Sequence, residues 1–504
     1  MFLRKLKSKN GKTYLQVVDK SSGKYKVLKS FGGTDSEEKL NQLIRRAKKW
    51  INYRSGTKEI DFSNSDELIK KFVDSISQMR HVGFDYLLGR IFDEIGFNEI
   101  DDELFKQLVI CRIAYPKSKL KTTQYLYRYK HIDWSEDQVY RYLDKLYTSQ
   151  KELVQQISYQ HTLSTLNNEI SVVFYDVTTL YFEIDQEDDL RKTGFSKEGK
   201  HQNPQIVLGL LVSRNGYPLA YEIFEGNKFE GHTMLPVLEA FKKKYNLEQL
   251  VIIADSGLLS KSNIEELQQR GYEFILGARI KNESHAIKKK ILKLNLENGQ
   301  SNAIKKGDLK LIVSHSDQRA KKDRYNRERG LRKLEKQIRA GRLTKSSINN
   351  RGYNKFLKLE GEITITIDTE KLALDANWDG LKGYITNAKL NKNQVIENYK
   401  HLWQIERAFR IAKSELKIRP VYHRLQRRIE AHICISFVAY KVYKELEKQL
   451  QDMNADISPL SAIEIAENIF EIEAKLPVSG KTIRKTLLLT EEQKHLAAIF
   501  DFGC

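Results

Sequence analysis

The pattern of apolar and polar residues divides the chain into a helical first part and a second part in which strands alternate with helices. In the first part, apolar residues recur at three- and four-residue steps over 36–54 and 65–165, which predicts amphipathic helices. Before them, strand-like runs at 13–18 and 25–28 flank turn residues at 21–23 and predict a small β unit. The N-terminal part is therefore expected to be mainly helical behind one small sheet.

Five short apolar runs then predict the strands of one mixed sheet. They are Ser171–Thr178, Gln205–Ser213, Tyr217–Phe224, Leu250–Ala254 and Tyr272–Leu276. The first run is apolar almost throughout, as in a strand covered on both faces. Between the second and third runs, Asn215-Gly216 predicts a hairpin. Helices are predicted after the third and fourth runs, and in this order of elements the first and fourth strands can be neighbours.

A charged interruption and a helical C-terminal part follow the predicted sheet. Residues 318–340 are charge-dense and predicted to be helical, and short strands are predicted at 362–368 and 383–386. Helices are then predicted at about 394–416 and at 427–450. The segments predicted on this basis are 1–60 (small β unit and basic helix), 61–168 (helical region), 169–282 and 393–445 (two parts of the sheet-bearing core), 283–392 (insertion) and 446–504 (C-terminal helical region).

The helix predicted around residue 406 carries two different faces. The core face, at helical spacing, consists of Leu402, Ile405, Ala408, Phe409, Ala412 and Leu416. The second face consists of Tyr399, Trp403, Glu406, Arg410 and Lys413. Packing needs only one face, so the aromatic, acidic and basic second face indicates a function. The alternative for Glu406 and Arg410 taken alone is an ordinary surface pair at i, i+4.

The charge of the chain indicates a polyanionic partner. The formal net charge is +20, and nucleic acid is the first candidate for a partner of so basic a protein. The alternative is a generically lysine-rich protein. The basic residues gathered in 318–340 favour nucleic acid, because such clusters bind phosphates.

A helix, a turn and a second helix are predicted between residues 122 and 147. Ser135 follows the turn and is placed to cap the second helix. The pair resembles a helix-turn-helix DNA reader, whose contacting residues would be Tyr140, Arg141, Tyr142 and Lys145. The alternative is that the two helices are merely packed together.

The cysteines and the hydropathy exclude several classes of protein. Cys111, Cys434 and Cys504 are far apart and show no CxxC spacing, which argues against a disulfide framework or a zinc site. We expect no signal peptide, because basic residues follow Met1 almost at once, and no membrane span, because no run of about 18 apolar residues occurs. A reducing, cytoplasmic location is therefore expected.

Three carboxylates are the candidate catalytic and metal-binding residues. Asp176 lies inside an apolar strand, where a charge is unfavourable unless it is neutralised, hydrogen-bonded or bound to a metal. Asp255 directly follows a second buried strand, at the edge where open sheets bind ligands. Glu406 lies on the two-faced helix. Oxygen ligands without His or Cys suit Mg²⁺ or Mn²⁺, and two such ions support phosphodiester chemistry.

Each carboxylate alone also has a structural interpretation. Asp176 fits a satisfied core acid, Asp255 fits a helix cap or turn residue, and Glu406 fits a surface pair. The coincidence of all three in this order of strands and helices favours a functional site over three separate structural roles.

Three sequence blocks resemble the DDE transposases of bacterial insertion sequences, in the superfamily named insertion-sequence four. The first two blocks are Phe174–Phe182 and Ile253–Ser260, which carry the two aspartates. The third follows the family signature Y-x2-R-x3-E-x6-K, and its Tyr, Glu and Lys positions are Tyr399, Glu406 and Lys413.

The third block departs from the family signature at one position and extends it at others. Leu402 stands where the signature has an arginine, and Arg407 or Arg410 is the candidate replacement for that DNA contact. Trp403–Arg410 and Arg419–His423 look like the long-protein branch of the superfamily.

The resemblance implies a fold and an activity. The fold is α/β, a ribonuclease-H-like mixed five-stranded sheet with flanking helices, interrupted by a β-rich and charged insertion and preceded by a mainly helical DNA-binding region. The activity is that of a bacterial, nucleoid-associated transposase. As a homodimer, it binds the terminal inverted repeats of double-stranded DNA, releases a 3′-hydroxyl and joins it to target DNA.

The resemblance also assigns roles to residues. Asp176, Asp255 and Glu406 would be catalytic and would hold two Mg²⁺ or Mn²⁺ ions. The DNA-binding residues predicted from the resemblance and the helical patterns together are Tyr399, Trp403, Arg407, Arg410, Lys413, Tyr140, Arg141 and Lys145. Two alternatives stay open: a ribonuclease-H-like nuclease or resolvase, and a catalytically silent DNA-binding regulator derived from a transposase. A silent regulator is expected to have lost a carboxylate, and this sequence has all three.

Overall fold

The computed structural model describes residues 1–55, 65–196, 199–247, 250–258, 260–349, 351–360 and 364–503. Contacts within the chain group it into two compact units, Met1–Met79 with Ile472–Lys485, and Arg80–Glu471 with Thr486–Cys504. The candidate catalytic residues all lie in the second unit. The six segments proposed from the sequence remain predictions.

The N-terminal part of the first unit is a three-stranded antiparallel sheet packed on one helix. The strands are β1 (Phe2–Lys7), β2 (Thr13–Asp19) and β3 (Lys26–Thr34), and the helices are α1 (Glu37–Ser55) and α2 (Ser65–Asp74). Leu15, Val17 and Ala47 form the buried core between β2 and α1. The sequence predicted β2, β3 and α1 but missed β1, because its apolar residues do not alternate at a two-residue period.

The central sheet has eight strands in the order β10–β11–β14–β9–β8–β5–β6–β7. Their bounds are β5 (Val172–Tyr181), β6 (Gln205–Ser213), β7 (Pro218–Glu225), β8 (Val251–Ala254), β9 (Glu273–Ala278), β10 (Ser301–Lys306), β11 (Leu309–His315) and β14 (Leu381–Thr386). The five predicted strands are adjacent, but the predicted number of strands is wrong. β14 pairs with the edge of β9, and β11 and β10 continue the sheet. This pairing satisfies an edge that would otherwise be open.

The predicted neighbours within the sheet are confirmed. β5 and β8, the first and fourth predicted strands, pair in parallel. β6 and β7 form the antiparallel hairpin predicted from Asn215-Gly216. Gly216 has a φ of +83°, which glycine adopts without steric strain.

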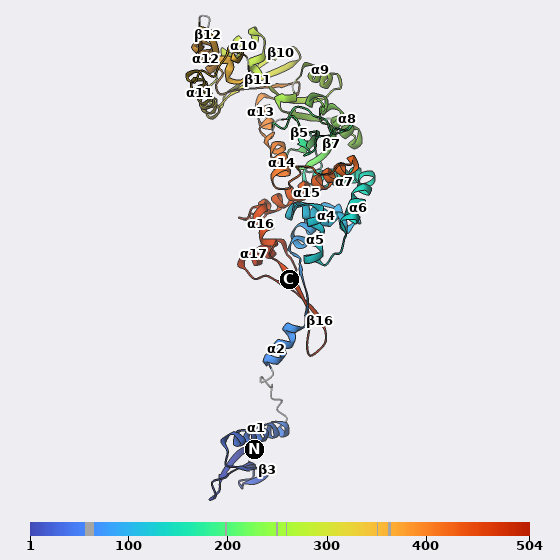
Figure 1. Cartoon of the computed structure of the whole chain (residues 1–504), viewed down its shortest axis with the longest axis vertical. Helices are drawn as coiled ribbons and strands as arrows, with labels where there is room; N and C mark the ends of the chain where they lie inside the picture. The colour runs from blue at the N-terminus through green and yellow to red at the C-terminus, as the bar shows by residue number, and fades with distance from the viewer. Residues whose placement is uncertain are drawn as a thin grey trace. The chain divides into compact units, whose positions relative to one another are not determined.

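Some helices of the second unit, such as α8 and α14, lie against the central sheet, and others, such as α16 and α17, form a separate group (Figure 1). The helices of this unit are α3 (Arg90–Ile95), α4 (Glu103–Ala114), α5 (Lys119–Lys130), α6 (Glu136–Ser149), α7 (Lys151–Thr165), α8 (Met234–Tyr245), α9 (Lys261–Gln269), α10 (His285–Leu292), α11 (Asp317–Arg339), α12 (Thr369–Ala376), α13 (Lys392–Lys400), α14 (Trp403–Ser414), α15 (Gln426–Asp452), α16 (Pro459–Ala466) and α17 (Glu491–Phe500). Ser135 caps α6 as predicted. Within the described ranges, no helix combines the length and apolarity needed to cross a membrane.

Five further strands lie outside the sheets described so far. They are β4 (Ile76–His81), β12 (Leu357–Glu360), β13 (Thr364–Ile367), β15 (Phe470–Lys475) and β16 (Thr482–Leu487). β4, β15 and β16 form one sheet, so the prediction that 65–165 is wholly helical is wrong, and the C-terminal helical region predicted at 446–504 also contains strands. Their pairing partners are remote in sequence, and local periodicity does not reveal such partners. The strand predicted at 362–368 is found in part, since 361–363 lie outside the described residues.

The side chains of β5 alternate between two hydrophobic cores, one on each face of the sheet. Val173 and Tyr175 belong to the core that includes residues of α8. Phe174 and Leu180 belong to the core that includes residues of α14 and α15. Since successive side chains of a strand point to opposite faces, Asp176 is on the same face as Phe174, the face covered by α14.

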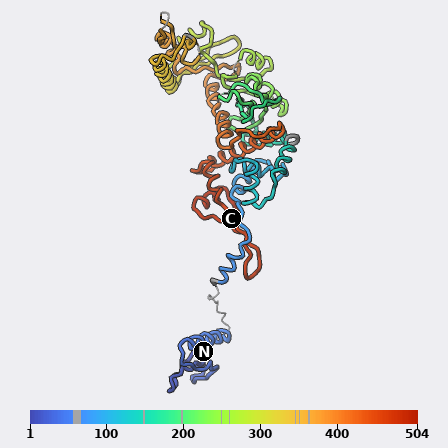
Figure 2. Tube along the Cα trace, in the orientation of Figure 1, coloured from blue at the N-terminus to red at the C-terminus, as the bar shows by residue number. Residues whose placement is uncertain are grey.

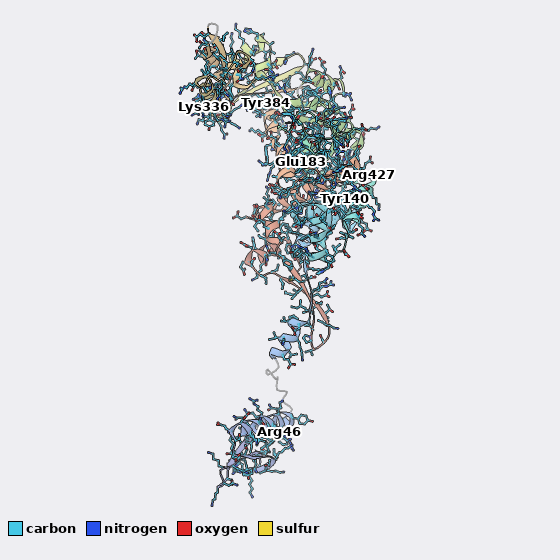
Figure 3. All side chains as sticks on the ribbon, viewed as in Figure 1. Arg46, Tyr140, Glu183, Lys336, Tyr384 and Arg427 are labelled. Atoms are coloured by element: carbon cyan, nitrogen blue, oxygen red, sulfur yellow. The ribbon has the colours of Figure 1, made fainter. Side chains whose placement is uncertain are left out.

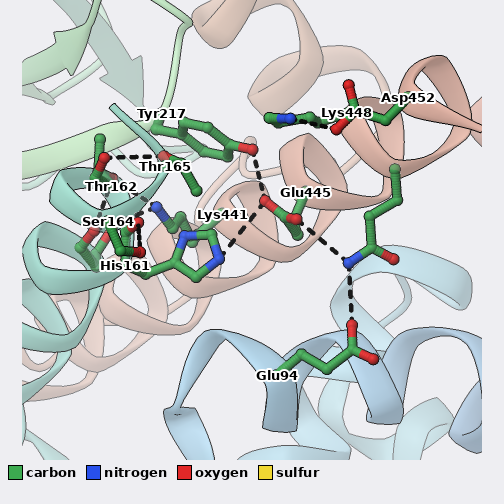
Figure 4. A network of polar contacts seen from close by, with 12 residues as sticks. Glu94, His161, Thr162, Ser164, Thr165, Tyr217, Lys441, Glu445, Lys448 and Asp452 are labelled. Carbon is green, nitrogen blue, oxygen red and sulfur yellow. Dashed lines mark hydrogen bonds and ion pairs between the residues drawn. The ribbon is translucent and has the colours of Figure 1, made fainter. Parts of the chain in front are cut away.

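The long helix α15 joins the N-terminal helices to the sheet. Figure 2 shows the red C-terminal trace beside the cyan trace of these helices, and α15 contacts α4, α6 and α7. Lys441 is fully buried, and its Nζ donates to the Ser158 carbonyl and to Thr162 Oγ1. The Tyr217 ring lies 4.1 Å from this ammonium, and its hydroxyl donates to Glu445 (Figure 4). The helical region and the sheet therefore share one packed interior.

Two cysteines behave as the sequence predicted. Cys111 and Cys434 are both free and buried, and burial raises the pKa of each thiol to about 12. Both thiols therefore stay protonated and act as apolar core residues. Cys504 lies outside the described residues.

Candidate active site at the ends of the central strands

The register of β5 and β8 brings two of the predicted carboxylates side by side. The parallel pairs run from Val172 with Val251 to Tyr175 with Ala254. The next residue on each strand is Asp176 and Asp255 respectively. Neighbouring strands lie about 4.8 Å apart, so two negative charges meet at this edge and repel one another unless a cation or a proton intervenes.

Asp255 and Glu406 line one open cavity of about 1180 Å³. Its walls come from the ends of β8, β9 and β14, from α13 and α14, and from the insertion helices α11 and α12. Asp176 is not among the described residues that line it. The structure therefore places two of the three predicted carboxylates in one cavity and the third beside one of them.

The helix predicted at 394–416 is in fact two helices, α13 and α14, joined by a turn at His401-Leu402. In this turn the Leu402 N–H donates to the Tyr399 carbonyl at 3.1 Å. Tyr399 and Glu406 lie on different helices but still line the same cavity. The bend turns Tyr399 and Leu402 into the core, where they are 4% and 6% exposed. Helical spacing alone does not reveal a bend that tertiary packing imposes.

Tyr399 orients Asp255 instead of facing solvent. Its hydroxyl donates to Asp255 Oδ1 at 3.5 Å, and the Ser256 backbone N–H donates to the same oxygen at 2.6 Å. A Cβ at Gly277 would lie 2.5 Å from the Tyr399 hydroxyl, so only glycine leaves room for this contact. Burial raises the pKa of Tyr399, and the charge of Asp255 raises it further. The phenol therefore remains protonated and serves as a donor.

The remaining predicted DNA-contacting residues near Glu406 differ in how far they are exposed and paired. Trp403 is 46% exposed and Arg410 is exposed. Arg407 forms an ion pair with the buried Glu447, and its guanidinium also lies 5.8 Å from the centre of the Trp403 ring. Lys413 is half-buried. Trp403 and Arg410 are thus available to a ligand, whereas Arg407 is engaged within the protein.

Helix α6 also presents a mixture of exposed and packed residues. Arg141 and Lys145 are exposed, whereas Tyr142 is buried in the core. Tyr140 is half-buried under the Arg428 guanidinium, 4.7 Å from the centre of its ring, where α6 meets α15 (Figure 3). The candidate contact at Tyr142 is therefore wrong, because its ring serves packing. The other three stay predictions.

The chemistry of the three carboxylates fits a hard divalent cation. Their donor atoms are all oxygens, which suits Mg²⁺ or Mn²⁺, and Asp176 lies in register beside Asp255. Within the part of the chain that the structure describes, however, no three His, Cys, Asp or Glu side chains converge closely enough to hold one ion. Glu406 is therefore near the aspartate pair without completing a cluster with it.

Lys382 is a residue of the cavity that the sequence did not indicate. It is the second residue of β14, and its ammonium lies 4.5 Å from the centre of the Tyr399 ring. The strand was predicted to begin one residue later, at Gly383, because the lysine interrupts the apolar pattern. A charged residue at the start of an otherwise buried strand was the available signal.

The family model described as Transposase DDE domain matches residues 167–441. No curated protein matches the chain. Among solved structures, the chain is similar to the piggyBac transposase synaptic complex with hairpin DNA, with a TM-score of 0.38 and 9% identity over 79% of each chain. It is also similar to the Mos1 transposase paired-end complex with the left transposon end. That match has a TM-score of 0.16 and 9% identity, over 34% of this chain and 58% of that chain.

Proposed function

The chain belongs to the DDE transposase family, whose model spans more than half of its length, and we propose that it cleaves DNA at the ends of a mobile element and joins them to target DNA. One observation carries the proposal. The parallel register of β5 and β8 ends at Tyr175 and Ala254, which Asp176 and Asp255 directly follow, and Asp255 lines the same cavity as Glu406. Family membership implies dependence on a divalent metal, and we propose Mg²⁺ or Mn²⁺, held by Asp176, Asp255 and Glu406.

Residues of the chain prepare this site for a phosphodiester. Ions bound there would activate the attacking oxygen and stabilise the leaving oxygen. Tyr399 and the Ser256 N–H hold the Asp255 carboxylate in one orientation. Trp403, exposed and lining the cavity, is placed to stack on a base next to the cleaved bond. The cavity exceeds the about 300–1,000 Å³ of small-ligand pockets, which favours a polymeric substrate.

The charge distribution supports double-stranded DNA as the substrate. The net charge is +20, and helix α11 presents a row of exposed cations beside the cavity (Lys336 in Figure 3). Those without an ion-pair partner in the described ranges are Lys321, Lys322, Arg324, Arg329, Arg332, Lys333, Lys336 and Arg339. Such a row suits the phosphate backbone and contributes to affinity without sequence specificity. Arg141 and Lys145 on α6 are proposed to contact the terminal inverted repeats.

Membership of the insertion-sequence-four superfamily of bacterial elements is part of the proposal. It rests on the signature positions Tyr399, Glu406 and Lys413. The departure at Leu402 is accommodated, because this side chain is buried in the core and an arginine there would need a partner. Arg410, exposed on the next helix, is proposed to make the missing DNA contact. We also propose a homodimer, because two element ends must be handled together.

The proposal is tested with the separate variants Asp176→Ala, Asp255→Ala and Glu406→Ala. Each is expected to lower Mg²⁺-dependent cleavage of a labelled duplex from the DNA flanking the coding region by at least about 10³-fold. Binding of the same duplex should stay within about threefold of wild type. A variant that carries all three substitutions and still cleaves at the wild-type rate would exclude a catalytic role for these residues.

A second assay separates a transposase from a nuclease. A duplex that already carries the nick is mixed with a supercoiled target plasmid. Joined product is expected from the wild type and not from the Asp255→Ala variant. Cleavage without joining would support the nuclease alternative.

A further inference from the structure

Lys382 occupies a fixed position inside the cavity. Its ammonium lies 4.5 Å from the centre of the Tyr399 ring and 5.5 Å from that of Tyr384. Both rings are buried, and an ammonium over an aromatic face is held by the negative charge of that face. The aromatic rings therefore restrict the lysine head group, which in an exposed lysine samples many rotamers.

The other cations of the cavity that lie on the insertion side are already paired. Lys281 and Lys355 each lie 2.9 Å from Asp375. Arg327 forms a two-pronged pair with Asp379, at 2.5 and 2.6 Å. Their donors are used within the protein, so these residues stabilise the wall more than they recruit a ligand.

Lys382 differs from them because its three donors are unused. In the described part of the chain, no hydrogen-bond acceptor or ion-pair partner is found for its Nζ. Burial lowers the pKa of Lys382 and Arg319 lowers it further, whereas Asp255 and Glu406 raise it. The two carboxylates therefore act on this ammonium across the cavity, although neither forms an ion pair with it. Because no group among the described residues accepts from this half-buried ammonium, its donors are available to a ligand that enters the cavity.

We propose that Lys382 binds a phosphate group of the DNA beside Asp255 and Glu406. Its aromatic support directs the ammonium into the cavity, and a phosphate oxygen supplies the strong anionic acceptor that the protein does not. The residue touches substrate and aligns the phosphodiester with the carboxylates, which act on the same bond. This inference rests on the proposed function, because it presumes DNA in the cavity.

The test compares Lys382→Met and Lys382→Arg with a matched control, Lys281→Met. The control also removes a lysine of the same cavity, but one that is paired with Asp375. Lys382→Met is expected to lower kcat/KM for cleavage of the flanking duplex by about 10- to 100-fold, the loss of one charge-assisted contact. Lys382→Arg keeps the charge and should recover most of the activity, while Lys281→Met should change it less than about threefold. Thermal unfolding of all three variants checks that the fold persists.

A binding measurement identifies the contact directly. One methylphosphonate replaces the phosphate that the wild type cleaves, and duplex affinity is measured without divalent ions. Neutralising this phosphate should weaken the wild type by about 10-fold or more and should leave Lys382→Met unchanged. An equal loss of affinity in both proteins would show that Lys382 does not contact this phosphate. Its role would then be to balance the negative charge of the carboxylates.

Failure of this inference is distinguishable from failure of the proposed function. If wild type and Asp255→Ala cleave equally, or if neither cleaves, the proposed function fails and the Lys382 role fails with it. If Asp255→Ala is inactive while the methylphosphonate weakens both wild type and Lys382→Met, only the Lys382 assignment fails.

Discussion

The two sides of the cavity hold their charges in different ways. On the insertion side, Arg327 and Asp379 are each 12% exposed and neutralise one another, and Asp375 has two lysine partners. On the side formed by the sheet and α14, Asp255 and Glu406 have no ion-pair partner among the residues that the structure describes. The same cavity therefore combines a neutralised wall with one whose charges are unpaired.

This difference separates architecture from function. Ion pairs that are closed within the protein hold α11 and α12 against the sheet and need no ligand. Asp255 and Glu406, which line one cavity without an ion-pair partner in the described part of the chain, repel one another, and such an arrangement persists where a ligand compensates it. Functional sites are the places where a chain departs from local rules of stability. We therefore propose that the sheet side is the reactive wall and that the insertion side supports it.

Removing the ion pair between Arg327 and Asp379 should destabilise the insertion side of the cavity and have little effect on cleavage. Arg327→Ala leaves the largely buried Asp379 carboxylate without its guanidinium partner and is expected to lower the local free energy of unfolding by about 2–3 kcal/mol. Hydrogen exchange of α11 and α12 should speed up accordingly, while cleavage changes less than about tenfold. Unchanged exchange in α11 would show that the pair contributes nothing to the wall.

Two arginines on α14 should have different roles, one in the stability of the fold and the other in DNA binding. Arg407→Ala leaves the buried Glu447 with Lys444 as its remaining partner, so we expect a loss of about 1–2 kcal/mol in stability and little change in DNA affinity. Arg410→Ala should leave stability within about 0.5 kcal/mol. Instead it should lower duplex affinity a few-fold and reduce the salt slope by about one. Thermal unfolding measures the stability of each variant, and salt-dependent titrations measure its DNA affinity. A loss of affinity in Arg407→Ala together with a loss of stability in Arg410→Ala would contradict these two roles.

The smallest effect is expected for Tyr399→Phe. Tyr399→Phe removes the 3.5 Å hydrogen bond to Asp255 but keeps the ring beneath Lys382. Because the bond is long, cleavage should fall only about two- to fivefold. Tyr399→Leu removes the ring as well and should give a larger loss, similar to that of Lys382→Met. If Phe and Leu behaved alike, the aromatic support of Lys382 would have no role.

Much of the site could be predicted because its parts are encoded locally. Asp176 stands out within an apolar strand and Asp255 ends the next parallel one, and the order of elements makes those strands neighbours. The parallel pairing of β5 and β8 confirms that the two strands are neighbours, with pairs up to Tyr175 and Ala254. The exposure of Trp403 likewise follows from its place on a helix with two faces. The burial of Tyr399 was not predicted, because a one-turn bend at Leu402 leaves helical spacing intact in the sequence.

The sequence by itself therefore determined the apolar strands, the hairpin at Gly216 and the helix spanning α11, because short-range patterns encode burial and turn chemistry. It also singled out the three carboxylates as candidates. Only the tertiary structure decided that β14 extends the sheet to eight strands, that Tyr399 supports Asp255 and that Lys382 enters the cavity. These features depend on which strand edges meet and which side chains face each other across a space. Such contacts join residues far apart in the chain, where no local periodicity records them.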